Sequence, residues 1–293
     1  MANGNSTVTT AEKHIDEVWV DGVIRAAEFE LVIAPTVDRS WEYKDHGDVY
    51  HKVRIPNIES QTKSASNALD AKVYTDTEQT ITINVHDACA IKHESIGALL
   101  SRNDVKSEMQ KGMGYSLGRK VDVNLAGLFA SFSQIQGTLG VELTFDQLLT
   151  ASQYLREAGY DMHNSVCWMF STAQGIATQK MDSFVNALYV GEAAAVSAHK
   201  NATIGQFQGA PVIESNLITA PAAGQHENAL YHKSLIALIM AQSPKSSVDY
   251  IGLELADVVV MDQVYGYSEV TRYSESPGNI TATDTGAVLL RGV

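Results

Sequence analysis

Gly114–Gly118 matches a catalytic motif more closely than any other stretch of this sequence. It reads Gly-Tyr-Ser-Leu-Gly and fits the G-x-S-x-G pattern, in which Ser116 would be the nucleophile of an α/β serine hydrolase. That motif needs an apolar strand directly before it, because the serine stands on a sharp strand-to-helix turn. Residues 103–111 are instead polar and helix-like, and no HGGG-type oxyanion segment lies upstream. We therefore favour a helix face for these small residues and keep the hydrolase as the alternative.

The other patterns that could support chemistry are incomplete. Gly112 and Gly114 do not complete the dinucleotide-binding pattern G-x-G-x-x-G, because position 117 is leucine. The nine histidines are scattered, and His93-Glu94 lacks the second histidine of the zinc-binding HExxH motif. We therefore expect no catalytic residue, no cofactor and no metal.

Composition excludes several further classes of protein. The chain has 293 residues, of which 45% are hydrophobic, and 34 acidic residues against 21 basic ones give a net charge of −13. The hydrophobic content is too high for wholesale disorder, and the negative charge argues against a protein that grips nucleic acid. No apolar run approaches the ~20 residues that span a bilayer, and the N-terminus lacks the features of a signal peptide. Cys89 and Cys167 lie far apart, which fits a reducing cytoplasm rather than a disulfide scaffold.

Residues 49–86 predict an arm that reaches away from the body. Apolar and polar residues alternate over 49–55 and again over 80–86, as in strands with one buried face. Between these strands, residues 57–79 are mostly polar, and linkers of this length are uncommon inside a compact domain. The pattern predicts a long hairpin-like arm, with an inert mobile loop as the alternative.

Two helices are predicted in the first half of the chain. Residues 12–26 form an amphipathic pattern, which would dock either on the chain's own body or on a neighbouring subunit. Residues 104–132 predict a long spine helix with an apolar residue at every fourth position: Val105, Met109, Met113, Leu117, Val121 and Leu125.

The second half predicts an α/β region followed by strands. Thr144–Gln147 is a capping box that opens a helix, and residues 165–170 read as a buried strand. Residues 230–242 and 253–273 predict two strands, with a turn near Pro244 and Lys245 between them.

This organisation resembles the major capsid protein of tailed bacteriophages, the Hong Kong 97-like shell fold. Gly47–Pro56 is similar to the strand that enters that family's extended E-loop, and Gly205–Asn216 is similar to its G-x-x-x-G-x-P-V segment. Ala229–Leu235 and Asp262–Arg272 resemble the two long strands of its peripheral domain, and the helix around Glu17–Trp19 resembles its N-arm.

The resemblance implies an α+β fold with an N-terminal arm, an extended E-loop hairpin, a peripheral domain with the spine helix, and an α/β axial domain. The implied boundaries are 1–40 for the N-terminal arm, 41–88 for the E-loop arm, 89–132 for the peripheral domain with its spine helix, 133–229 for the axial domain, 230–273 for the long peripheral strands, and 274–293 for the C-terminal segment.

The same resemblance implies a non-enzymatic subunit that assembles into hexamers and pentamers of an icosahedral head around double-stranded DNA. A portal, and scaffolding or decoration proteins, would be its partners, and the shell would assemble in the host bacterial cytoplasm to become part of the virion. An encapsulin-like cargo shell is the alternative within this class. The expected assembly residues are Trp19, Ile58, Lys63 and Leu69, with Pro244 and Lys245 in the peripheral turn.

Overall fold

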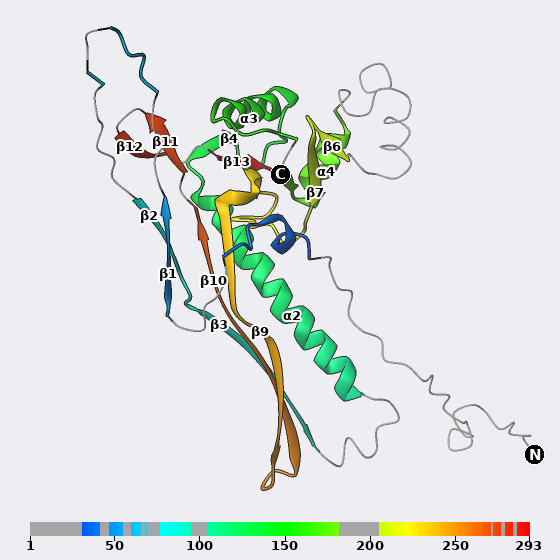
Figure 1. The fold of residues 1–293 in the computed structure, drawn as a ribbon. Coiled ribbons are helices and arrows are strands. Elements are labelled where there is room, and N and C mark those ends of the chain that lie inside the picture. The colour runs from blue at the N-terminus through cyan, green and yellow to red at the C-terminus, as the bar shows by residue number, and fades with distance from the viewer. Residues whose placement is uncertain are drawn as a thin grey trace, which may run out of the picture.

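The computed structural model has an elongated α+β architecture with a compact upper part and arms that project from it (Figure 1). It describes residues 31–41, 47–54, 60–65, 68–69, 77–94, 105–163, 165–181, 205–270, 272–276, 279–283 and 286–293. Among these residues, no helix is both long and apolar enough to cross a membrane. The predicted helix over 12–26 lies outside the described residues.

A six-stranded mixed sheet forms the compact upper part. Its strand order is β4 (Gln134–Gly137), β13 (Ala287–Gly292), β8 (His226–His232), β5 (Val166–Phe170), β7 (Ala210–Glu214) and β6 (Gln206–Phe207). β5 pairs in parallel with β7 and antiparallel with β8, and all five of its residues are buried. An apolar strand of this kind is typical of a sheet that is covered on both faces.

Two helices pack against this sheet, and both begin as their sequences predict. Helix α3 (Phe145–Glu157) starts at a complete capping box between Thr144 and Gln147. Helix α4 (Thr172–Gln179) is capped by the Ser171 side chain, which accepts a hydrogen bond from the Gln174 backbone. The apolar side of α3 helps to enclose a core around Trp168: Leu143, Leu148, Ala151, Leu155, Phe170, Leu230, Val288 and Leu290.

Two parts of this sheet differ from the sequence-based expectation. Ala229–Leu235, which resembles a long peripheral strand, lies instead in β8 and in the short 3-10 turn Lys233–Leu235. Residues 229–231 are buried because β5 and β13 flank them, whereas Lys233 and Ser234 in the turn are exposed. β13, from the C-terminal segment 274–293, lies between β4 and β8 and so is part of the sheet that residues 133–229 were expected to form.

A three-stranded antiparallel sheet forms the lower part of the molecule, with helix α2 (Val105–Gly127) running beside it (Figure 1). Its central strand is β10 (Ala256–Glu269), with β3 (Val85–Glu94) and β9 (Ile236–Ile251) at the edges. The predicted apolar stripe of α2 is buried at four positions: Met113, Leu117, Val121 and Leu125. A 3-10 turn, η3 (Leu128–Ser131), continues α2 towards the predicted end at 132.

The predicted turn at Pro244 and Lys245 is wrong, because β9 runs through both residues and turns back only after Ile251. The ladder shifts register where Lys245 pairs with Asp262 and Gln242 pairs with Val264, so two residues of β9 face one of β10. This β-bulge accommodates Pro244 in an edge strand, where proline's missing N–H leaves no central ladder bond unmade.

Two hairpins complete the fold. β1 (Val49–Arg54) and β2 (Thr77–Thr82) pair antiparallel at the base of the E-loop arm, which confirms a hairpin there. The second strand predicted over 80–86 is divided, because β2 ends at Thr82 and β3 begins at Val85. β11 (Arg272–Ser276) pairs antiparallel with β12 (Asn279–Thr283). In the sequence, this second hairpin lies between β10 of the lower sheet and β13 of the upper sheet. A short 3-10 turn, η2 (Ala34–Thr36), follows the first described residues.

Candidate assembly surfaces

The lower sheet and α2 are joined by buried hydrogen bonds. The Tyr265 hydroxyl, on β10, donates to Asp87 Oδ2 at 2.7 Å and accepts from Asn124 Nδ2 at 2.6 Å. Burial, and then Asp87, raise the pKa of Tyr265 well above its ordinary value, so the hydroxyl keeps its proton. Gln263 Nε2 donates to the Leu117 carbonyl at 3.0 Å. These bonds connect β3, β10 and α2. The lower sheet together with α2 is called the peripheral arm below.

Asp122 on α2 holds the chain segment that leads in from the N-terminus. Its carboxylate accepts from the backbone N–H of Ile33 at 3.1 Å and of Ala34 at 2.9 Å, and the side chain is fully buried. Burial raises the pKa of Asp122, and the backbone hydrogen bonds oppose part of that rise. The carboxylate satisfies two N–H groups that would otherwise be buried without partners.

The base of the E-loop arm packs on β9 through a small apolar cluster. Ile81 is fully buried against Ala237, Ile239 and Val270. Next to this cluster, the Lys52 ammonium lies 4.9 Å from the centre of the Trp41 ring. The arm is therefore anchored where it leaves the body.

A glycine allows the E-loop base to cross β10 closely. A Cβ atom at Gly266 would lie 2.5 Å from the Thr82 carbonyl oxygen and 3.0 Å from Ile83 Cα. No side chain fits between backbones at that distance, so Gly266 sets the position of the crossing. Tyr265 and Gly266 are thus packing residues, as the strand interpretation of this segment requires.

Beyond its base, the described part of the E-loop arm is exposed. Lys63 is exposed, and Leu69 keeps 58% of its surface accessible. Val53, on the outer end of β1, keeps 62%. The two other predicted assembly residues, Trp19 and Ile58, lie outside the described residues.

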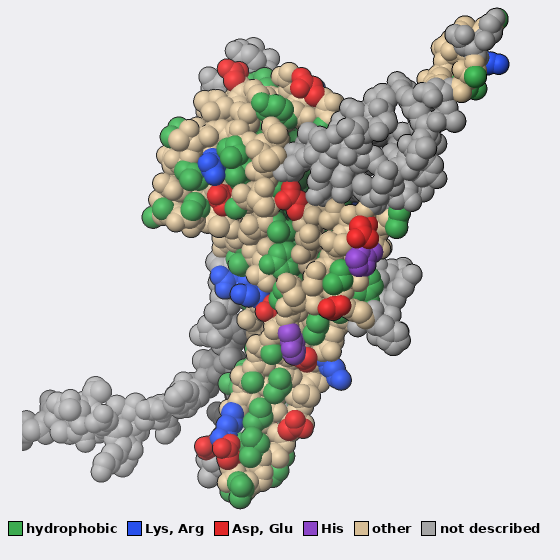
Figure 2. Space-filling view, turned by 90° about the vertical axis from the view of Figure 1, so that its left-hand side faces the viewer, with side chains coloured by type: hydrophobic (Ala, Val, Ile, Leu, Met, Phe, Trp, Pro, Cys, Tyr) green, Lys and Arg blue, Asp and Glu red, His purple; other side chains and the backbone are tan. Residues whose placement is uncertain are grey.

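The strongest apolar exposure is one that the sequence interpretation missed. The end of the β9–β10 hairpin, residues 248–255, is called the arm tip here. It carries Val248 at 47%, Tyr250 at 59%, Leu253 at 101% and Leu255 at 63% exposure. Figure 2 shows hydrophobic side chains along the lower arm towards its end. The alternation from Val248 to Tyr250 could have identified this strand, but the expected turn at Pro244 placed these residues in a loop.

Several exposed large apolar side chains within one hairpin end are typical of a surface that contacts another protein. Within the chain, the described tip is supported by the β9–β10 ladder and by an ion pair between Lys92 and Glu254. Neither shields the large side chains from water. Exposed groups of apolar residues on soluble proteins mark interaction sites.

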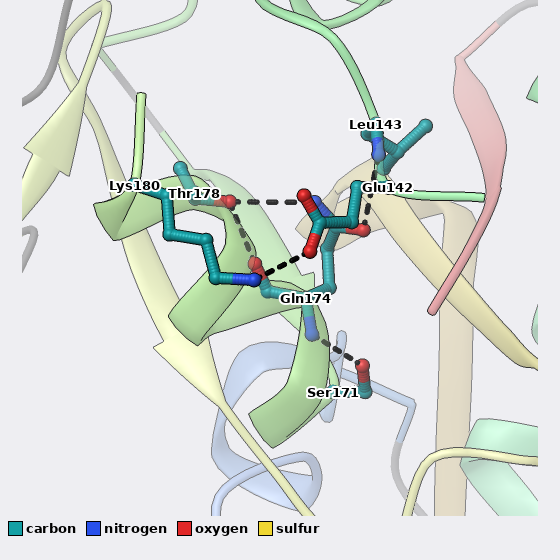
Figure 3. Close-up of polar contacts among 6 residues, drawn as sticks. All are labelled: Glu142, Leu143, Ser171, Gln174, Thr178 and Lys180. Atoms are coloured by element: carbon teal, nitrogen blue, oxygen red, sulfur yellow. Dashed lines mark hydrogen bonds and ion pairs between the residues drawn. The ribbon is translucent and has the colours of Figure 1, made fainter. Parts of the chain in front are cut away.

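A cluster of polar contacts around Gln174 holds α4 against the upper sheet (Figure 3). The buried Gln174 side chain accepts from the Leu143 N–H at 3.4 Å through Oε1, and the Gln174 backbone N–H donates to Ser171 Oγ at 3.1 Å. Thr178 Oγ1 donates to the Gln174 carbonyl at 2.8 Å, and Lys180 pairs with Glu142 at 2.5 Å. The geometry joins α4 to the 142–143 loop and offers no nucleophile beside a base.

Ser116 lies in the middle of α2, and its side chain is exposed. The helix passes through it without a break, so the strained strand-to-helix turn of a nucleophile elbow is absent. Among the described residues, no group of three or more His, Cys, Asp or Glu side chains is placed to hold a metal ion.

Comparison with known proteins identifies the fold. No protein-family model matches the sequence, and no curated protein matches it. Solved structures do match over nearly the whole chain. A capsid structure of Helicobacter pylori bacteriophage KHP30, described as stable in acid, superposes with a TM-score of 0.81 at 10% identity and covers 100% of this chain and 99% of its own.

Two further matches come from other phages. A structure of Mycobacterium phage Che8 gives a TM-score of 0.76 at 17% identity and covers 94% of this chain and 96% of its own. The capsid structure of cyanophage P-SCSP1u gives 0.76 at 14% identity, with 98% and 95% covered. This chain has the fold of a tailed-phage major capsid protein. The Hong Kong 97-like shell fold implied by the sequence motifs is confirmed.

Proposed function

We propose that this chain is the major capsid protein of a phage head. The observation that carries the proposal is that the match to capsid structures spans 94% to 100% of the chain, arms included. Arms with exposed apolar side chains are unfavourable for a lone subunit but bury their surface when identical subunits assemble. Closed symmetry then satisfies every such contact.

The subunits would form hexamers and pentamers of an icosahedral shell. In that shell the E-loop arm lies over a neighbouring subunit, with Ile58 and Leu69 buried there and Lys63 at the rim. Trp19 contributes from the N-terminal arm. The expected domain boundaries, apart from the strands described above, remain part of this proposal.

The shell would enclose double-stranded DNA without reading its sequence. A net charge of −13 disfavours tight binding to phosphates, so packaged DNA could move along the wall. A portal, and scaffolding or decoration proteins, would be further partners. Assembly would take place in the host bacterial cytoplasm, and the product would be part of the virion. Similarity to phage structures favours this head over an encapsulin-like cargo shell.

Removing the end of the E-loop arm tests whether these residues contribute to the folding of the subunit or to its assembly. We expect that replacing residues 58–70 by a short Gly/Ser turn leaves the melting temperature nearly unchanged, because Leu69 is exposed and residues 60–65 are exposed too. Each large apolar side chain lost from an intersubunit contact would remove about 1.5–3 kcal/mol, repeated at every copy. Thermal melts and negative-stain electron microscopy of parent and variant check both halves.

The melts and the microscopy together distinguish three outcomes. A variant that melts normally but forms no particles supports an assembly arm. Intact particles of unchanged stability would show an inert loop, and a collapsed melt would show that these residues belong to the core.

A further inference from the structure

One side of α2 lies between the face that packs on the sheet and the face that receives the incoming N-terminal segment, and part of it borders the edge strand β3. It is formed by residues three or four positions apart, which lie on one helix face: Met109, Gly112, Ser116, Arg119, Lys120 and Val123. We call this face the basic flank. Met109 and Val123 expose 38% and 37% of their surface, and a Cβ atom at Gly112 would meet nothing within 4 Å. The flank borders a pocket of about 370 Å³ against β3.

The two cations of the flank are adjacent in the sequence of this acidic chain. Lys92, Lys111 and Lys180 each pair with a carboxylate, whereas Arg119 and Lys120 pair with none of the described residues. Asp87 also borders the pocket, but its Oδ2 already accepts from Tyr265. The flank therefore presents net positive charge between two apolar side chains.

We propose that the basic flank is the docking site for residues 12–26 of the same chain. Residues 12–26 contain four acidic and two basic residues, and the apolar ones recur at helical spacing, Trp19 included. An amphipathic helix of this kind can set carboxylates against Arg119 and Lys120 and place its apolar side on Met109 and Val123.

The segment joins the described chain about half a turn around α2 from the flank, within reach for docking in one subunit. Leu31 lies against α2 at Gly118, where a Cβ atom would come within 2.7 Å of Leu31 Cδ1. Residues 27–30 reach at most about 14 Å when extended. A helix over 12–26 would be about 22 Å long, and α2 is about 35 Å long. So short a tether gives the segment a millimolar effective concentration at the flank.

Disulfide trapping tests this placement directly on the unassembled full chain. In a Cys89→Ser background, Ser116→Cys is combined in turn with Trp19→Cys, Val23→Cys or Ala26→Cys. Gln153→Cys on α3 replaces Ser116→Cys in the matched controls, because Gln153 is also exposed. We expect at least one Ser116→Cys pair to form an intramolecular disulfide, mapped by mass spectrometry, and the controls to form none.

Charge reversal tests the electrostatic part. We expect Arg119→Glu with Lys120→Glu to speed tryptic cleavage after Arg25 about tenfold, which corresponds to about 1.4 kcal/mol of docking free energy. Arg156→Glu with Lys233→Glu makes the same charge change at exposed sites of the upper part and should leave the rate unchanged.

Three results would overturn the proposal. Absence of any disulfide to Ser116→Cys would show that the segment does not reach the flank. A disulfide between two chains would assign the flank to a second copy's segment. Binding of a short DNA duplex that depends on Arg119 and Lys120, without a disulfide, would assign the cations to nucleic acid. Because the assays use the unassembled chain, failure to form shells would leave their results valid.

Discussion

The upper sheet and the peripheral arm differ in how much of their strands they bury. β5 buries every one of its five residues between β7 and β8. β9 begins with four buried residues at Ile236–Ile239 and is exposed from Ser243 to Ile251. The upper sheet therefore completes its core within one chain, whereas the arm leaves its outer half exposed. The comparison predicts that mutations in the two regions affect different steps, folding in the first and assembly in the second.

Trp168→Ala should have the largest effect on folding. Trp168 is fully buried, its ring centre lies 5.2 Å from that of Phe207, and its Nε1 donates to the Phe207 carbonyl. Truncating a buried aromatic side chain costs about 3–5 kcal/mol of unfolding free energy. Denaturant titration checks this, with Tyr250→Ala at the arm tip as the control that should stay near the parent. Equal losses at both sites would contradict the comparison.

Gly266→Ala should have the next largest effect, because the new Cβ meets backbone atoms of Thr82 and Ile83. We expect a loss of about 1–3 kcal/mol, together with displacement of the E-loop base. The matched control is Gly112→Ala, where the new atom meets nothing and a helix gains stability by about 1 kcal/mol. Thermal melts of both variants test the sign of each change. A neutral Gly266→Ala variant would show that the crossing can relax freely.

Asp122→Asn should cost about 1–2 kcal/mol at neutral pH, because an amide cannot accept from both Ile33 and Ala34. The pH dependence of the stability difference between the parent and Asp122→Asn is a more specific test of this carboxylate. Burial raises the pKa of Asp122 above 3.8, so the folded chain binds a proton more readily than the unfolded chain. The stability of the parent relative to Asp122→Asn should therefore rise as pH falls through the folded pKa, and level off below about 4. A difference that shrinks with falling pH would contradict this assignment.

Local patterns in the sequence predicted the elements whose causes are local. The Thr144–Gln147 capping box, the apolar stripe of α2 and the alternating strands at the E-loop base all depend on residues a few positions apart. Each was therefore visible without knowledge of distant neighbours.

The features that depend on distant pairing were not predictable in the same way. β13 enters the upper sheet by pairing in parallel with β4, more than 140 residues earlier, and nothing local encodes that position. Pro244 indicated a turn because proline usually ends strands, whereas the bulge opposite β10 accommodates it in an edge strand. That one misplaced turn also hid the arm tip, the candidate site with the greatest apolar exposure.

The most direct test of the shell proposal is to place charge on the arm tip. Leu253→Asp combined with Leu255→Asp should change the unfolding free energy of the subunit by less than about 0.5 kcal/mol, because both side chains are exposed. Negative-stain electron microscopy of the parent, with any scaffold it requires, should show closed particles, and the double variant should remain as subunits or small capsomers. A parent that stays a 31.7 kDa monomer under all assembly conditions, or a variant that forms normal particles, would contradict the account.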